Sequence, residues 1–89
     1  MAWRIEFDRA AERELDKLEP QIARRILKFI QDRIANRDDP RSIGEALKGD
    51  RLGSYWKYRI GDYRVITSIE DTDMRIIIVR IGDRKDVYR

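Results

Sequence analysis

The sequence predicts an α+β fold, with an N-terminal strand, an α-helical hairpin and a three-stranded antiparallel β-meander, the helices packed on one face of the sheet. Two observations support this order. Apolar residues recur every three or four positions between residues 9 and 37, whereas they alternate or run together between residues 55 and 81. A chain of 89 residues can bury one modest hydrophobic core, so the helices and the sheet must share it. Residues 1–89 are therefore expected to form a single domain.

The first half of the chain predicts a strand followed by two helices. Residues 3–7 (WRIEF) alternate in polarity, as a strand does. Asp8 is a suitable N-cap for a helix that carries apolar residues at helical spacing up to Leu18. Pro20 suits the first turn of a second helix of about 16 residues, because the N–H that proline lacks would be unsatisfied there. The pair Asp39-Pro40 ends this helix, so the two helices form a hairpin.

The second half predicts three strands after a connection. Residues 38–54 are rich in Gly, Asp and Ser, and we expect a loop there with at most one helical turn. Strands are predicted at 55–60, 63–69 and 74–81, and Gly61-Asp62 is a two-residue hairpin signal between the first two. The first strand of the chain should then lie beside one of the meander strands.

The composition excludes several classes of function. The chain has no cysteine, which removes disulfides and thiol nucleophiles, and no histidine, which removes the commonest general base and metal ligand. We therefore expect no metal and no cofactor. No apolar stretch approaches the roughly 20 residues of a membrane span, and the N-terminus lacks the apolar segment of a signal peptide. The expected location is the cytoplasm, with no membrane partner.

The excess positive charge lies in the C-terminal part of the chain. The net charge is +3, and residues 1–50 hold 11 Lys or Arg against 11 Asp or Glu, whereas residues 51–89 hold 9 against 6. A cationic half suggests an anionic partner, and nucleic acid is the leading candidate.

Strand periodicity gathers three of these cations on one face. With a two-residue turn at Gly61-Asp62, Arg59 lies opposite Arg64, and Lys57 lies two residues further along the same face. No acidic residue is expected in this patch. Opposed like charges destabilise a sheet by about 0.2–1 kcal/mol, so removal of Arg59 should stabilise the free protein slightly. A solvated polar face is the alternative, but the recessed position of the cations favours an anion-binding site.

The C-terminus could complete this site. The strand over 74–81 pairs with 63–69, so its end emerges near Arg64, and Gly82 permits a sharp change of direction. Arg84 could then reach the patch, and Tyr88 could place its ring beside a base or its hydroxyl beside a phosphate. Alternatively, Tyr88 merely anchors the terminus, which is the role that we expect for Val87.

Two segments carry a family resemblance: LKGDRLGSYWKYRIGDYRVITSI and IIIVRIGDRKDVYR. They resemble the RelE/ParE superfamily of toxins from bacterial type II toxin–antitoxin systems, with the RelE-like branch nearest. The Leu-x-Gly connection, the K-x-R strand, the G-x-Y-R strand and the terminal R-x-x-x-Y match in order and spacing, and with the preceding strand and helix pair they cover nearly the whole chain. The chain departs from many relatives at Asp83, where they carry His or Lys.

The resemblance implies a function, a site and partners. RelE-type toxins cut messenger RNA in the ribosomal A site, and an antitoxin wrapped around them holds them inactive. By motif, the resemblance assigns catalytic roles to Lys57, Arg59, Arg64, Arg84 and Tyr88. It implies as partners a RelB-like antitoxin, the small ribosomal subunit and messenger RNA, with operator DNA bound only through the antitoxin.

RNA cleavage without a metal can use the adjacent 2′-hydroxyl as nucleophile, which leaves a 2′,3′-cyclic phosphate and a 5′-hydroxyl. Lys57 is the expected base, because neighbouring cations favour its neutral form. Arg59 and Arg64 should stabilise the charge that develops on the phosphate. Arg84 should assist departure of the 5′-oxygen, and Tyr88 should stack on a base or orient it.

Two alternatives are kept beside this hypothesis. A ParE-like toxin blocks DNA gyrase without catalysis, although such toxins tend to lack this combination of basic residues and a tyrosine. A non-enzymatic nucleic-acid-binding module would use the patch only to contact phosphates. Substitution separates the classes, because a nuclease would lose cleavage and keep its ribosome affinity, whereas a binding module would lose affinity.

Overall fold

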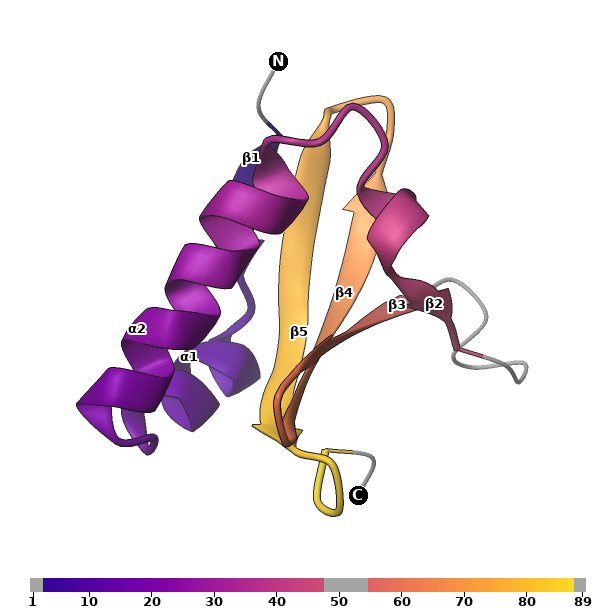
Figure 1. Cartoon of the computed structure of the whole chain (residues 1–89). Helices are drawn as coiled ribbons and strands as arrows, with labels where there is room; N and C mark the ends of the chain where they lie inside the picture. Colours follow the sequence, from indigo (N-terminus) through magenta and orange to yellow (C-terminus); the bar gives the residue numbers. More distant parts are fainter. Residues whose placement is uncertain (1–2, 48–54, 88–89) are drawn as a thin grey trace.

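The structure, a computed structural model, describes residues 3–47 and 55–87. Within these ranges the chain forms two α-helices, one π-helical and one 3-10 segment, and five strands, with α1 and α2 on one side of the sheet (Figure 1). The elements are β1 (Arg4–Phe7), α1 (Arg9–Asp16), α2 (Pro20–Phe29), η1 (Ile30–Ala35), η2 (Pro40–Ile43), β2 (Glu45–Ala46), β3 (Tyr55–Ile60), β4 (Tyr63–Glu70) and β5 (Arg75–Asp83).

The strands join in one sheet with the order β1-β5-β4-β3-β2. β3, β4 and β5 form the antiparallel meander, and β1 pairs in parallel with β5, Arg4 lying opposite Arg75. The α+β prediction is therefore confirmed, including the position of the first strand beside the meander. The predicted strand count was wrong, because β2 also pairs with β3; so short a strand leaves no periodic pattern in the sequence.

The helices begin where the sequence predicts. The Asp8 side chain accepts a hydrogen bond from the Arg9 N–H at the start of α1, and Pro20 is the first residue of α2. α2 runs directly into the π-helical segment η1, so helical structure continues from Pro20 to Ala35, as expected for the second helix. No helix among the described residues has the length and apolar character needed to cross a membrane.

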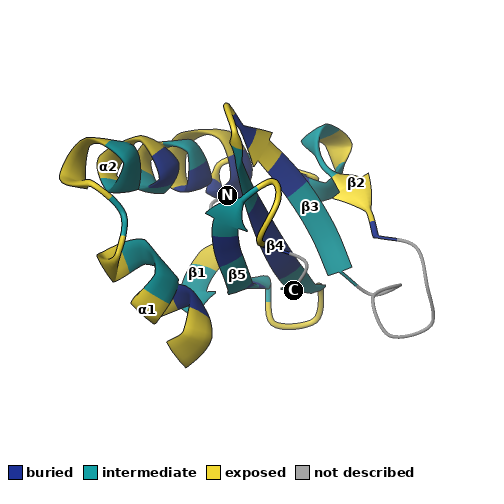
Figure 2. Ribbon diagram, turned by 90° about the horizontal axis from the view of Figure 1, so that it is seen from below, coloured by how far each residue is buried: buried dark blue, intermediate teal, exposed yellow. Residues whose placement is uncertain are grey.

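The larger hydrophobic core lies between the helices and the sheet. Figure 2 shows buried residues along β3, β4 and β5 and on one side of α2. Val65 and Ile78 belong to this core, whereas the adjacent Ile66 packs with Leu47 and Val87 in a second, smaller cluster. Successive strand residues point to opposite faces, so this cluster covers the face turned away from the helices. Val87 is buried there, which confirms its expected role as an anchor of the terminus.

Polar contacts fix the connection between the helices and the meander. Arg41 in η2 donates to both carboxylate oxygens of Asp71, from Nη1 at 2.9 Å and from Nη2 at 2.7 Å. The Arg41 guanidinium also lies 5.8 Å from the ring centroid of Trp56. The Tyr58 hydroxyl donates to the Pro40 carbonyl at 2.8 Å. These contacts hold η2 against β3 and the β4–β5 turn, and they thereby position β2, which begins two residues after η2 ends.

The buried phenol of Tyr58 predicts a loss of stability at alkaline pH. Tyr58 is 1 % exposed, and burial raises the pKa of its hydroxyl from 10.0 to about 12. Because the pKa is higher in the folded state, this contribution is complete below about pH 10 and is lost as the pH rises through about 12; it amounts to about 2–3 kcal/mol.

Denaturant unfolding of wild type and of Tyr58→Phe between about pH 9 and pH 12 tests this contribution. We expect the free energy of unfolding to fall less steeply in the variant, because phenylalanine has no proton to lose. Lysines and the other tyrosines are present in both proteins, so their effect cancels in the comparison. Equal slopes would contradict the prediction.

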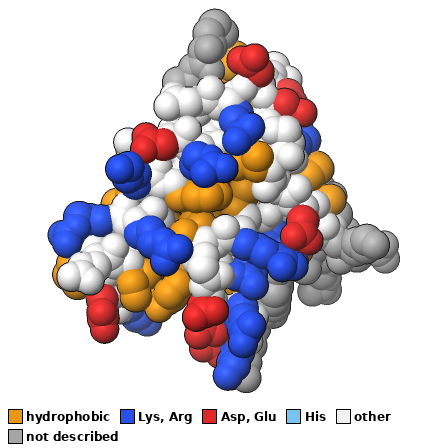
Figure 3. Space-filling model, in the orientation of Figure 1, with side chains coloured by type: hydrophobic (Ala, Val, Ile, Leu, Met, Phe, Trp, Pro, Cys, Tyr) orange, Lys and Arg blue, Asp and Glu red, His pale blue; other side chains and the backbone are white. Residues whose placement is uncertain are grey.

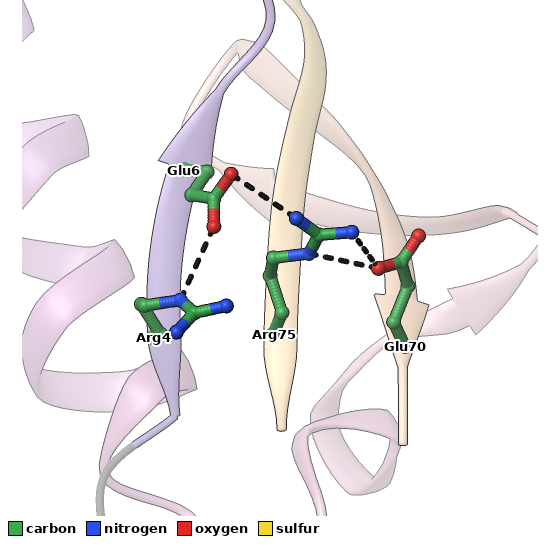
Figure 4. A network of polar contacts seen from close by, with 4 residues as sticks. All are labelled: Arg4, Glu6, Glu70 and Arg75. Atoms are coloured by element: carbon green, nitrogen blue, oxygen red, sulfur yellow. Dashed lines mark hydrogen bonds and ion pairs between the residues drawn. The ribbon is translucent and has the colours of Figure 1, made fainter. Parts of the chain in front are cut away.

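Ion pairs link β1, β5 and β4 at the end of the sheet opposite the β3–β4 turn. Glu6 lies between two arginines, 3.2 Å from Arg4 Nε and 3.5 Å from Arg75 Nη1 (Figure 4). Arg75 also donates to Glu70, with its Nε at 2.8 Å from the carboxylate, and this contact raises the pKa of Arg75. The network therefore links three strands and carries no net charge.

Candidate active site

The β3–β4 hairpin brings three of the predicted site residues together. Its turn is Gly61-Asp62, and Gly61 has a φ of +59°, which glycine adopts at little cost. The predicted register is confirmed, with Arg59 opposite Arg64 and Lys57 opposite Ile66. Because Ile66 belongs to the smaller cluster, the three cations lie on the face of the sheet turned away from the helices.

A carboxylate shares this patch, contrary to the sequence-based expectation. Glu45 in β2 lies opposite Lys57, with its Oε2 at 3.8 Å from Lys57 Nζ and its Oε1 at 3.2 Å from Arg59 Nε. The expectation was wrong because the predicted loop forms the edge strand β2. A single glutamate in a connection rich in Gly and Asp gives no signal that it will join a sheet, so sequence reasoning missed it.

The three cations differ in exposure and therefore in what they can bind. The Lys57 side chain is only 17 % exposed, whereas that of Arg59 is 59 % exposed. A recessed ammonium requires a partner charge, and Glu45 supplies it. Lys57 therefore forms the floor of the patch, and Arg59 forms its rim.

Arg64 is held by its own hairpin. Its Nη1 donates to the carbonyls of Gly61, at 3.0 Å, and Tyr63, at 2.9 Å. Within the described part of the chain, its Nε and Nη2 groups have no hydrogen-bond partner, so they remain available to an anion. Arg59 and Arg64 thus have separate partners that relieve their repulsion, and the expected gain in stability on removing Arg59 no longer follows.

The C-terminal segment returns to the same hairpin. Gly82 lies opposite Arg64, and the backbone N–H of Arg84 donates to the Asp62 carbonyl at 2.9 Å. The side chain of Arg84 is exposed. The predicted site residue Tyr88 lies outside the described residues. The structure therefore brings Lys57, Arg59 and Arg64 together, fixes the backbone of Arg84 at their hairpin, and adds Glu45.

The arrangement is suited to a phosphodiester rather than to a metal ion. Lys57, Arg59 and Arg64 offer N–H donors to phosphate oxygens, and the carboxylate of Glu45 can accept a proton beside them. Among residues 3–47 and 55–87, no group of three or more acidic side chains is placed to hold a metal ion.

Comparison with known proteins places the chain in a family. The model of the ParE toxin of type II toxin–antitoxin systems matches residues 5–88. Toxin RelG of Mycobacterium tuberculosis is 29% identical over 89 residues, which covers 100% of this chain and 99% of that protein. Toxin RelE of the same organism is 31% identical over 87 residues, which covers 98% of this chain and 87% of that protein.

The fold agrees with these relatives. A chain in the crystal structure of the toxin–antitoxin complex RelBE2 from Mycobacterium tuberculosis superposes with a TM-score of 0.85 at 27% identity, covering 97% of this chain and 95% of that one. The family resemblance seen in the sequence is thereby confirmed. The chain belongs to the RelE/ParE superfamily of toxins from type II toxin–antitoxin systems.

Proposed function

We propose that this toxin is a metal-independent endoribonuclease that cuts messenger RNA in the ribosomal A site and so inhibits translation. The observation that carries this proposal is the grouping of Lys57, Arg59 and Arg64 on one face of the sheet, with the carboxylate of Glu45 paired to Lys57 and Arg59. This grouping combines cations for a phosphate with a group that can take up a proton. Cleavage at phosphorus by the adjacent 2′-hydroxyl needs both.

The proposed reaction forms a bond between the 2′-oxygen and phosphorus and breaks the bond to the 5′-oxygen. The 2′-hydroxyl gives its proton to the base, the 5′-oxygen takes one from solvent water, and the products are a 2′,3′-cyclic phosphate and a 5′-hydroxyl. Arg59 and Arg64 stabilise the added negative charge in the transition state, because guanidinium groups bind phosphate oxygens in two-point contacts. Arg84 stabilises the departing oxygen.

Glu45 is the stronger candidate for the base. The sequence favoured Lys57, on the assumption that only cations surround it, but the Glu45 carboxylate lies 3.8 Å from its Nζ and forms an ion pair with it. The Glu45 carboxylate can accept the proton directly. Lys57 then binds the phosphate, and Tyr88 stacks on a base of the message, where stacking contributes about 1–3 kcal/mol. The ribosome supplies the remaining alignment of the substrate.

Single-turnover cleavage of messenger RNA on programmed ribosomes tests these roles. We expect Lys57→Ala and Glu45→Gln each to slow cleavage by about 10²–10⁴-fold while ribosome affinity is kept. The matched control is Glu70→Gln, which removes a carboxylate charge paired with an arginine at the other end of the sheet and should leave the rate unchanged. Full activity of Glu45→Gln would show that Glu45 is not the base and would make Lys57 the candidate again.

The ParE family match supports an alternative, in which the toxin inhibits DNA gyrase without catalysis. Two assays of the wild type separate the two functions. A gyrase inhibitor would block supercoiling in a purified assay and would leave ribosome-bound RNA intact. A non-enzymatic binding module would show neither activity, and Lys57→Ala would lower its affinity for RNA. Cleavage by the wild type with intact gyrase activity is the result that we expect.

We further propose that a RelB-like antitoxin neutralises the toxin by docking on α2, and that operator DNA is bound only through this antitoxin. A surface pocket of about 280 Å³ is lined by Arg25, Lys28, Phe29, Asp32 and Arg33. Figure 3 shows hydrophobic side chains exposed on this face of the molecule, with Lys and Arg around them. Phe29 is the apolar residue of this lining, and the three cations outnumber the single carboxylate of Asp32, so the surface is complementary to an acidic amphipathic helix.

Charge reversal at Lys28 tests this docking site. We expect Lys28→Glu to weaken binding of a RelB-like antitoxin by about tenfold and to reduce the dependence of this binding on salt, because rim charges act through complementary potentials. Lys17→Glu is the control, since Lys17 is exposed at the C-cap of α1 and does not line the pocket. Equal affinities of both variants, measured by titration calorimetry, would exclude α2 as the docking surface.

A further inference from the structure

The segment after β5 closes into a turn around Asp83. The Asp83 carbonyl accepts hydrogen bonds from the backbone N–H groups of Asp86 and Val87, both at 3.0 Å. Its side-chain Oδ1 accepts a third from the N–H of Lys85 at 2.7 Å. An aspartate that accepts from the N–H two residues ahead is the usual cap of a helical turn. Asp83 therefore organises the turn with both its backbone and its carboxylate.

This turn folds back closely on the open face of the sheet. A Cβ atom on Gly82 would lie 3.5 Å from both Cα and Cβ of Val87, so the tail passes directly over the end of β5. Val87 is 1 % exposed and packs with Ile66, the cross-strand neighbour of Lys57. The turn capped by Asp83 thus forms one wall of the cationic patch.

Arg84 is held between this cap and the β3–β4 hairpin. It is the first residue after Asp83, and its N–H donates to the Asp62 carbonyl at 2.9 Å. The preceding turn residue, Gly61, accepts from the Arg64 guanidinium at 3.0 Å. Arg64 and Arg84 are therefore both held by the Gly61-Asp62 turn. The contact of Arg84 with this turn depends on the fold of the segment after β5.

The negative charge of the Asp83 carboxylate would repel an anionic substrate, so its charge alone does not explain its presence at this site. Its hydrogen bond to Lys85 gives it a different role. We propose that Asp83 is a positioning residue, whose side chain caps the terminal turn and so fixes Arg84 where it meets the substrate phosphate. This inference rests on the proposed RNA cleavage. It requires an acceptor at position 83 and does not require a negative charge.

The test is single-turnover RNA cleavage on programmed ribosomes by wild type, Asp83→Ala, Asp83→Asn, Arg84→Ala and the double variant Asp83→Ala/Arg84→Ala. Loss of the cap should slow cleavage by about tenfold in Asp83→Ala, while Asp83→Asn stays within about twofold, because asparagine caps as well as aspartate. The double variant should be no slower than Arg84→Ala alone, since Asp83 acts through Arg84. Asp73→Ala, an exposed aspartate in the turn before β5, is the control and should keep the wild-type rate.

Three results would overturn the inference: a wild-type rate in Asp83→Ala, multiplicative losses in the double variant, or an Asp83→Asn rate as low as that of Asp83→Ala. Amide hydrogen exchange at Lys85 and Val87 gives a readout independent of activity. It should accelerate in Asp83→Ala and stay protected in Asp83→Asn, and unchanged exchange in Asp83→Ala would refute the cap. Absence of cleavage by the wild type would instead overturn the proposed function, so the two failures are distinguishable.

Discussion

Replacement of Arg64 by alanine is expected to abolish growth inhibition and to slow cleavage of ribosome-bound messenger RNA by about 100-fold or more. Two backbone carbonyls of the hairpin hold the Arg64 guanidinium, so its charge is already oriented before substrate arrives. Such a preorganised group costs little to align in the transition state, which is why its removal should have a large effect. Growth of cells that express the variant, and single-turnover cleavage in vitro, measure the two consequences.

Arg4→Ala is the matched control for this substitution. Arg4 is also a strand arginine on the face away from the helices, but it lies at the opposite end of the sheet and is exposed. This variant should remain toxic and keep the wild-type rate. Toxicity of a folded, well-expressed Arg64→Ala protein would remove Arg64 from the site.

The largest expected effect on stability comes from Ile78→Ala. Ile78 is completely buried in β5, where it lies opposite Phe7 of β1 and Thr67 of β4. Truncation of a buried isoleucine leaves a cavity and costs about 2–5 kcal/mol. Whole domains are stable by only about 5–15 kcal/mol, so the variant should approach the limit of folding.

Ile77→Ala is the control, because Ile77 is the neighbouring residue on the same strand and is only partly buried. Urea unfolding of both variants should show a clearly smaller loss for Ile77→Ala, with similar slopes against denaturant. Equal losses would mean that the two faces of the sheet do not differ in packing as described.

The hairpin and its register followed from the sequence because short-range rules determine them. Gly61-Asp62 fixed the turn, and alternation then placed Arg59 opposite Arg64. The position of Glu45 beside Lys57 could not be predicted from turn type and strand alternation. Its pairing with Lys57 depends on contacts that are distant in sequence, namely those of Arg41 with Asp71 and of Tyr58 with Pro40.

A bulge in β5 is a second feature that alternation could not predict. Ile66 lies opposite Arg80, but the next residue, Thr67, lies opposite Ile78, so Val79 is the extra residue. The bulge changes the side-chain pattern, and Ile81 thereby joins the helix-facing core with Ile76 and Ile78. Alternation from Ile78 would have placed Ile81 on the other face. The end of β5 and the start of the tail depend on this irregularity.

The parallel pairing of β1 with β5 has a consequence for the order of assembly. Glu6 and Arg75, which form an ion pair, are 69 residues apart in the chain. Contacts between such distant residues form late, because the intervening chain must be ordered before they contribute. During synthesis, the N-terminal strand must therefore wait for the last strand, and Arg84 leaves the ribosome later still. We expect the growing chain to lack the complete cationic site until β3, β4 and the segment after β5 have all been synthesised, because the site takes its side chains from these elements.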